Sequence, residues 1–219
     1  AIDSVLVARG ERDGHLGALL AQCRKRGLPV KEVDARRLDS LCGVGHQGIA
    51  ALAACKAYAT LDDLFDAAQS KGEPPFFVIG DELEDPHNLG AILRTAEATG
   101  VHGVIVPKRR AVGLTAAVYK ASAGAAEYVP VARVSNLVDT IKELKKRGVW
   151  IYGLDMDGEP WCASDWTGPT AVVVGSEGRG IGRLVREHCD FIVSLPMQGA
   201  ISSLNASVAC GVVLYEAAR

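Results

Sequence analysis

Three short stretches of the sequence carry polar side chains whose types and spacing could do chemistry. The stretch DPHNLGAILR holds Asn88 and Arg94, VVGSEGRGIG holds Glu177 among four glycines, and SSLNAS holds Ser203 and Asn205. Glycines let a ligand approach the backbone closely, and the N–H groups at a helix start suit an anion or a carboxylate. The three stretches therefore indicate a ligand-binding site, provided that the fold brings them together.

Arg94 is unexpected at its position. Residues 88–98 have the apolar spacing of a helix that buries one face, and Arg94 stands beside Leu93. Taken singly, Asn88 could be an N-cap, Gly90 a tight-turn residue and Arg94 a surface residue with a partly covered stem. Because Gly90 and Arg94 are four residues apart, they share a helix face, which favours a role at a ligand.

The glycine spacing argues against two common nucleotide sites. Gly178, Gly180 and Gly182 follow G-x-G-x-G, whereas a dinucleotide site requires G-x-G-x-x-G and an acid after the next strand, where Ser194 and Leu195 stand instead. The sequence also lacks the Lys-Ser or Lys-Thr pair of a P-loop here. A flexible connection between a strand and a helix remains the simple alternative.

The third stretch opens an apolar helix expected over residues 203–218. Ser202, Ser203, Asn205 and Ser207 crowd its first turns. One N-cap requires only one such residue, so a helix start that binds a ligand is favoured. Polar side chains facing water on an amphipathic helix are the alternative.

The elements that must position these stretches alternate regularly from residue 76 onward. Short continuous apolar runs, such as FFVIG, GVIVP, AVVVG and FIVSL, are separated by helical patterns. This alternation is typical of an α/β fold with a parallel sheet covered by helices on both faces. Ligands bind beyond the carboxyl ends of such strands, so the loops after residues 80, 107, 175 and 195 are expected to form the site.

The sequence before residue 76 predicts a separate, smaller part. Residues 1–55 read as a small α/β domain, 56–75 as a linker with one helix, and 76–219 as the larger domain. The net charge of the whole chain is −2, yet residues 1–56 hold nine basic and six acidic side chains. The whole-chain charge therefore does not indicate a nucleic-acid partner, although its distribution is uneven.

Other features bound the class of protein. The sequence has no run approaching the roughly 18 apolar residues of a membrane span, and its opening does not resemble a signal peptide. The six cysteines form no CxxC pair and have no histidine at zinc-ligand spacing. We expect a cytoplasmic protein without a metal site. The chain starts inside an apparent strand, so we also expect native residues before Ala1.

The three stretches, in this order, resemble the three motifs of the SpoU (TrmH) family of RNA ribose 2'-O-methyltransferases, a SPOUT family. The matching residues are Asn88, Gly90, Arg94, then Gly175, Glu177, Gly178, then Ser203, Leu204, Asn205, Ser207. Longer stretches, including GVHGVIVPKRR and LPMQGAISSLNASVA, are similar to members that methylate a guanosine of bacterial 23S ribosomal RNA. The departures are a missing opening helix, GDELEDPHN in place of an Asp-Gly-Val form, and Ala206 in place of valine.

The resemblance implies a fold, a cofactor and partners. The catalytic part would be a SPOUT-type parallel sheet with a C-terminal trefoil knot, and residues 1–55 an incomplete L30e-like RNA-binding domain. The cofactor would be S-adenosyl-L-methionine, with no metal, and the protein would be a homodimer whose active site is completed across the subunit boundary. The implied catalytic residues are Arg94, Asn88, Glu177, Ser203 and Asn205. The implied cofactor contacts are Gly175, Leu195 and Leu204.

The role of Arg94 is open between two possibilities. The resemblance makes it the group that activates the ribose 2'-hydroxyl, but a guanidinium with a pKa above about 12 holds its proton. Electrostatic stabilisation of the developing oxyanion is therefore the safer interpretation. In that case Glu177 would fix the guanidinium plane through a forked hydrogen bond.

RNA is expected to contact basic side chains, which would bind phosphates without reading bases. The candidates are Arg9, Arg12, Arg24, Lys25, Arg26, Arg36, Arg37, Lys108, Arg109 and Arg110. Two alternatives remain: methylation of a ribose in transfer RNA, and a non-catalytic RNA-binding or ribosome assembly factor on the same fold.

Overall fold

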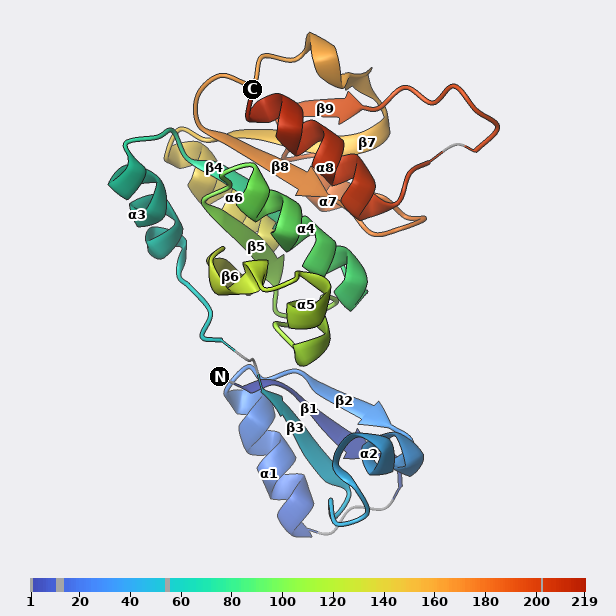
Figure 1. Cartoon of the computed structure of the whole chain (residues 1–219). Coiled ribbons are helices and arrows are strands. Elements are labelled where there is room, and N and C mark those ends of the chain that lie inside the picture. The colour runs from blue at the N-terminus through green and yellow to red at the C-terminus, as the bar shows by residue number, and fades with distance from the viewer. Residues whose placement is uncertain (1, 11–13, 54–55, 202) are drawn as a thin grey trace. The chain divides into compact units, whose positions relative to one another are not determined.

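The computed structural model describes residues 2–10, 14–53, 56–201 and 203–219 (Figure 1). The chain divides into two compact units, one of residues 1–57 with 113–115 and the other of residues 58–112 with 116–219. Within the described ranges, no helix has the length and apolar character needed to cross a membrane.

The first unit is a three-stranded sheet with two helices. Its elements are β1 (Ile2–Ala8), α1 (Gly14–Lys25), β2 (Val30–Val33), α2 (Ala35–Cys42) and β3 (Ile49–Ala53). Strand β1 is central, parallel to β2 and antiparallel to β3. Val5 and Val7 point to the same face of β1 and pack with Leu20 in a small core.

The second unit is built on a six-stranded sheet. Its strands are β4 (Phe76–Gly80), β5 (Gly103–Pro107), β6 (Val131–Val134), β7 (Trp150–Pro160), β8 (Thr170–Val174) and β9 (Phe191–Ser194). Their spatial order is β6-β5-β4-β8-β7-β9, and every neighbouring pair is parallel. This confirms the prediction of an α/β fold with a parallel sheet.

Helices cover both faces of this sheet, as the continuous apolar strands predict. They are α3 (Leu61–Lys71), α4 (Pro86–Ala98), α5 (Ala116–Ala121), α6 (Leu137–Lys146), α7 (Arg183–Arg186) and α8 (Ala206–Ala217). Helices α3, α6 and α7 share one core with Phe77 and Ile79 of β4. Val78 points to the opposite face and is also fully buried; there α4 packs against α5 and α8 (Figure 1).

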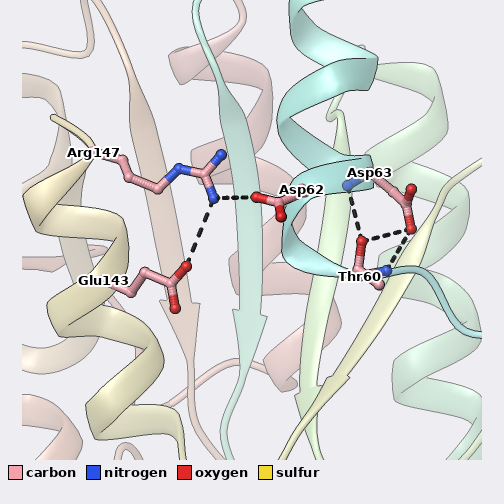
Figure 2. Close-up of polar contacts among 5 residues, drawn as sticks. All are labelled: Thr60, Asp62, Asp63, Glu143 and Arg147. Atoms are coloured by element: carbon pink, nitrogen blue, oxygen red, sulfur yellow. Dashed lines mark hydrogen bonds and ion pairs between the residues drawn. The ribbon is translucent and has the colours of Figure 1, made fainter.

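Helix α3 lies in the segment that we expected to be a linker. Thr60 caps it in a reciprocal pair with Asp63: the Asp63 N–H donates to Thr60 Oγ1 at 3.2 Å, and the Thr60 N–H donates to Asp63 Oδ2 at 2.7 Å (Figure 2). Leu64 has no exposed surface and belongs to the core shared with β4. In the structure this helix is part of the second unit.

An arginine at the end of α6 holds α3 in place. Arg147 Nη1 donates to Asp62 Oδ1 at 2.8 Å and lies 3.7 Å from Glu143 Oε1, so it joins α3 to α6 (Figure 2). Its guanidinium also stands 3.4 Å from the centroid of the Phe65 ring. The basic end of α6 is therefore a structural contact in part, not only a solvated helix end.

Two helix starts differ from the sequence-based expectation. Helix α4 begins at Pro86, and Asp85 is its N-cap, accepting a hydrogen bond from the His87 N–H at 3.0 Å. Asn88 is therefore not the cap. Helix α8 begins at Ala206 rather than at 203, with Asn205 as N-cap. Ser202 lies outside the described residues.

Candidate active site

A pocket with a volume of about 950 Å³ lies beyond the carboxyl ends of β8 and β9 and beside the middle of β7. Four segments line it: residues 154–156, 174–180, 194–197 and 203–206, together with Ala209. This is where a parallel sheet places its ligands, because the carboxyl ends of its strands meet at one edge.

Six of the residues proposed from the sequence line this pocket. They are Gly175, Glu177, Leu195, Ser203, Leu204 and Asn205. Leu204 is 42% exposed, so its side chain is available to a ligand rather than packed in the core. Asn88 and Arg94 do not line the pocket.

The turn after β8 requires glycine at its first position. A Cβ atom on Gly175 would lie 2.1 Å from the carbonyl carbon of Gly180, far closer than such atoms approach. Ser176 and Gly180 exchange two backbone hydrogen bonds, of 3.1 and 3.0 Å, and so close a tight turn. Glu177 lies in this turn and is exposed to the pocket. The turn is therefore closed by its own backbone hydrogen bonds.

The three sequence motifs meet at the rim of this pocket. Asn88 Nδ2 donates to Glu177 Oε1 at 3.0 Å, and Asn205 Nδ2 donates to Asn88 Oδ1 at 2.9 Å. Asn205 Nδ2 also donates to Glu177 Oε1. Asn88 is buried, so its amide is held by these contacts rather than by solvent. One side chain from each motif thus takes part in a single hydrogen-bond network.

Asn205 has a second function at the start of α8. Its Oδ1 accepts hydrogen bonds from the backbone N–H groups of Ser207 at 3.0 Å and Val208 at 3.3 Å, and from Ser207 Oγ at 2.6 Å. The carbonyl end of the amide caps the helix while the amino end enters the network. This fixes which way the amide points.

Arg94 lies apart from the network. It is exposed on α4, and its side chain makes no hydrogen bond or ion pair with any described residue. Within one chain, Glu177 Oε1 accepts from the two asparagine amides, and no hydrogen bond joins Glu177 to Arg94. Arg94 is next to Thr95, which lines an apolar groove between α4 and α8.

The sequence did not single out the middle of β7 as part of the site. Leu154, Asp155 and Met156 line the pocket, and Arg186 Nη1 holds Asp155 through an ion pair of 2.7 Å. Residue 154 ends an apolar run in the same parallel sheet, so the rule that placed the other loops at the site would have placed this one too.

A buried carboxylate, that of Asp81, binds the backbone of the glycine-rich segment. Asp81 follows β4 and accepts a hydrogen bond from the Gly182 N–H at 2.8 Å. Burial raises the pKa of Asp81, while the hydrogen bond from Gly182 opposes that change. Asp81 thereby joins the loop after β4 to the loop after β8.

The basic residues proposed for RNA lie on the surface. Those in the first unit that the structure describes are exposed: Arg9, Arg24, Lys25, Arg26, Arg36 and Arg37. Arg12 lies outside the described residues. In the second unit, Lys108, Arg109 and Arg110 are exposed directly after β5.

Among the described residues, no three His, Cys, Asp or Glu side chains form a metal-binding group. Independence from metal stays a prediction, which activity in the presence of a chelator would test.

Comparison with known families matches both units. The profile of the SpoU rRNA methylase family matches residues 75–215, and a profile described as RNA 2'-O ribose methyltransferase substrate binding matches residues 1–59. YacO of Bacillus subtilis, assigned by name to the TrmH family of tRNA/rRNA methyltransferases, is 52% identical over 207 residues, covering 94% of this chain and 83% of that protein. A Staphylococcus haemolyticus protein named for the same family is 45% identical, covering 100% and 88%.

Solved structures agree with this assignment. The SpoU methyltransferase AviRb of Streptomyces viridochromogenes, crystallised with the cofactor AdoMet, superposes with a TM-score of 0.66 at 27% identity, covering 100% of this chain and 82% of that one. The TrmH/SpoU tRNA modifying enzyme of A. aeolicus gives 0.61 at 31% identity, covering 67% of this chain and 75% of that one. The parallel sheet thus has the SPOUT methyltransferase fold; the trefoil knot stays a prediction. By the profile match over residues 75–215 and the identity to its relatives, the chain belongs to the SpoU methylase family.

Proposed function

We propose that this protein transfers a methyl group from S-adenosylmethionine to the 2'-oxygen of a ribose in RNA, with a guanosine of 23S ribosomal RNA in the cytoplasm as the target. The observation that carries the proposal is the network of Asn88, Glu177 and Asn205 at the rim of the pocket. These residues come from three separate motifs and have no shared role in packing the core.

The pocket suits the proposed cofactor. Its volume of about 950 Å³ falls in the range of small-molecule sites. Leu195 and Leu204 offer apolar surface to an adenine ring, and the turn at Gly175 exposes backbone groups for its polar edge. The Glu177 carboxylate at the rim complements a positively charged ligand. When bound, S-adenosylmethionine supplies a methyl group already activated on a sulfonium.

The side chains of this chain would then position the acceptor and stabilise charge. A ribose hydroxyl is a weak acid, so the negative charge that develops on its oxygen needs a nearby cation. We assign this role to Arg94, because a guanidinium is a planar cation that can donate forked hydrogen bonds. We assign Asn88, Glu177 and Asn205 to holding the rim, and Ser203 to contact with the acceptor.

We further propose a homodimer in which Arg94 of one subunit acts at the pocket of the other. Two observations support it: Arg94 does not line the pocket of its own chain, and the groove beside it is apolar. In that groove Val208 is 53% exposed and Tyr215 is 61% exposed. Exposed apolar side chains gathered along one helix are typical of a surface that another protein covers.

The choice between ribosomal and transfer RNA rests on the first unit. The match of residues 1–59 to a substrate-binding profile, and the exposed basic side chains there, favour a large RNA. The transfer-RNA alternative is supported by the A. aeolicus structure, which is described as a tRNA modifying enzyme and covers 67% of this chain. A non-catalytic RNA-binding factor is the third possibility.

One assay separates these possibilities. The protein is incubated with methyl-labelled S-adenosylmethionine and either deproteinised large-subunit RNA or transfer RNA, and the label is traced to sugar or base. We expect label on the sugar of the large-subunit RNA, and a loss of about 100-fold or more in Arg94→Ala. Lys142→Ala, which removes an exposed cation from α6, should keep full activity. Label on the base would contradict ribose methylation, label only on transfer RNA would favour the alternative target, and no label on either RNA would favour the non-catalytic factor.

A further inference from the structure

Three strand-end loops of the second unit are tied together beside the pocket. Asp81 accepts a hydrogen bond from the Gly182 N–H at 2.8 Å, which joins the loop after β4 to the loop after β8. The Val112 N–H donates to the carbonyl oxygen of Leu83 at 2.8 Å, which joins the loop after β4 to the loop after β5. Side chains on these loops are therefore held at fixed relative positions.

Glu82 lies between two arginines that come from the other two loops. Arg110 Nη1 lies 2.8 Å from Glu82 Oε1, and Arg179 Nη2 lies 3.5 Å from Glu82 Oε2. The Glu82 side chain is only 21% exposed, whereas the side chains of Arg110 and Arg179 are 74% and 77% exposed. A guanidinium has five N–H donors, so most donors of both arginines remain available to a ligand in solvent.

The backbone at this contact is strained. Glu82 and Arg110 both have a φ of 55°, in the left-handed region that residues other than glycine rarely adopt. A surface ion pair contributes about 0–1 kcal/mol, too little to explain left-handed conformations at both of its members. Strain of this kind concentrates at ligand-binding sites, where the surrounding structure holds it.

The arrangement suits an anion that reaches the pocket. Arg179 lines the pocket as well as contacting Glu82, while Lys108 and Arg109 are exposed beside Arg110. Two forked guanidinium groups converging from separate loops match the oxygens of one phosphate group.

We propose that Arg110 and Arg179, positioned by Glu82, bind one backbone phosphate of the RNA substrate next to the methyl-transfer pocket. This proposal rests on the function proposed above, because it takes RNA as the ligand. Arg110 and Arg179 contact the phosphate, and Glu82 is a positioning residue. Its carboxylate orders two long side chains that would otherwise lose rotamer freedom when the phosphate binds.

If Glu82 positions the two arginines, its removal should change the affinity for RNA in the direction opposite to that expected from charge alone. Removing a carboxylate from a basic surface normally strengthens binding of RNA, because it removes charge repulsion. If Glu82 positions the arginines, Glu82→Gln should weaken binding instead. Glu84 provides the matched control: it is exposed, acts on Arg110 through its charge alone, and removing it leaves the two ion pairs of Glu82 in place.

The test measures the dissociation constant of the full chain for deproteinised large-subunit RNA over a range of salt concentrations. We expect Arg110→Gln to weaken binding by about tenfold. Removal of one phosphate-binding group lowers the slope of log affinity against log salt by about 0.7–0.9. Because both arginines bind one phosphate, which the remaining arginine still neutralises in part, each single variant should lose at most one such increment, and the Arg110→Gln/Arg179→Gln double variant should lose one increment, not two. Glu82→Gln should weaken binding several-fold, and Glu84→Gln should leave it unchanged or tighten it.

Three results would overturn the proposal: an unchanged salt slope in the double variant, a double variant that loses two increments, or a Glu82→Gln variant that tightens binding as Glu84→Gln does. Thermal unfolding of each variant identifies any that fails to fold. If Arg110→Gln fails, Arg110→Lys replaces it. Lysine keeps the positive charge but cannot donate two parallel hydrogen bonds, so this variant should still weaken binding. Methyl transfer by the wild type is measured on the same RNA. If the wild type transfers no methyl group to this RNA, the proposed function is contradicted. If the wild type does transfer it but the variants bind RNA as the wild type does, only the phosphate site is contradicted.

Discussion

Asn205 donates from its Nδ2 to Oδ1 of Asn88, 117 positions earlier in the chain, at a distance of 2.9 Å. The bond joins the first turn of α4 to the N-cap of α8. Since the same Asn205 side chain caps α8, a shift of either helix start would separate the amides and release Glu177. The geometry of the candidate site therefore depends on how these two helices pack.

Replacing Asn205 should separate its two functions. Asn205→Ala removes both the cap and the amide donor, and we expect a loss of about 1 kcal/mol in stability together with a large loss of methyl transfer. Asn205→Asp keeps an oxygen that can cap the helix but puts a second carboxylate beside Glu177. We therefore expect near-normal thermal stability with low activity. Equal stability losses in both variants would show that the cap contributes little.

Mixing two inactive variants tests whether the active site crosses the subunit boundary. Arg94→Ala and Glu177→Ala subunits are co-expressed in equal amounts. If Arg94 acts at the partner's Glu177, each mixed dimer has one intact site, and random pairing should restore about a quarter of wild-type activity. If both residues act within one chain, every site in the mixed dimer is damaged and activity stays low.

Gly90 should tolerate no side chain. A Cβ atom there would lie 2.4 Å from the Ala121 Cβ and 2.9 Å from its carbonyl carbon, because α4 and α5 approach closely at this point. We expect Gly90→Ala to cost about 1–3 kcal/mol in the free energy of unfolding. Adding Ala121→Gly should recover part of that cost, which a double-mutant cycle with urea unfolding would measure. Strictly additive losses would mean that the two positions do not meet.

His102 should make stability depend on pH. It is buried, its Nδ1 accepts from the Phe76 N–H at 3.1 Å, and its Nε2 lies 3.0 Å from Glu73 Oε2. Burial lowers the pKa of His102, opposed by the hydrogen bond to Glu73, with the charge of Lys71 lowering it further. The unfolded state therefore binds the proton more readily, at about pH 6.5.

The contribution of His102 is thus fully present above about pH 6.5 and is lost as the pH falls toward the lowered pKa of the folded state. Urea unfolding between about pH 5 and 8 should show a decline on the acid side that is smaller in His102→Gln. An identical pH dependence in the two proteins would contradict this assignment.

Much of the second unit could be predicted from the sequence because its strands are buried on both faces. Phe77, Val78 and Ile79 have no exposed surface, and short continuous apolar runs of this kind are typical of parallel strands. The extension of β7 to Pro160 could not be predicted. Three of its residues from Asp155 onward are acidic, and the chain returns to pair with β9 after a register shift between Leu154 and Glu159. That pairing depends on a contact with a strand formed over 30 residues later.

The sequence predicted which residues lie at the candidate site better than it predicted the hydrogen bonds among them. The motif spacing identified Asn88, Glu177 and Asn205, and the structure brings these together. The motif spacing did not indicate that Glu177 would accept hydrogen bonds from the amides of Asn88 and Asn205 rather than from Arg94. The partners of the Glu177 carboxylate depend on where α4 and α8 begin. Asp85, not Asn88, is the N-cap of α4, which leaves the Asn88 amide to bind Glu177. Single-sequence patterns do not resolve such competition.

Every residue that lines the pocket lies between positions 154 and 209. A ribosome that has made the first 150 residues has already produced the whole first unit and three strands of the second, but none of the pocket. During synthesis, a nascent chain would therefore carry its basic surface before it could hold a methyl donor. Interrupted translation in this window would leave a fragment with the exposed basic side chains of the first unit and no pocket.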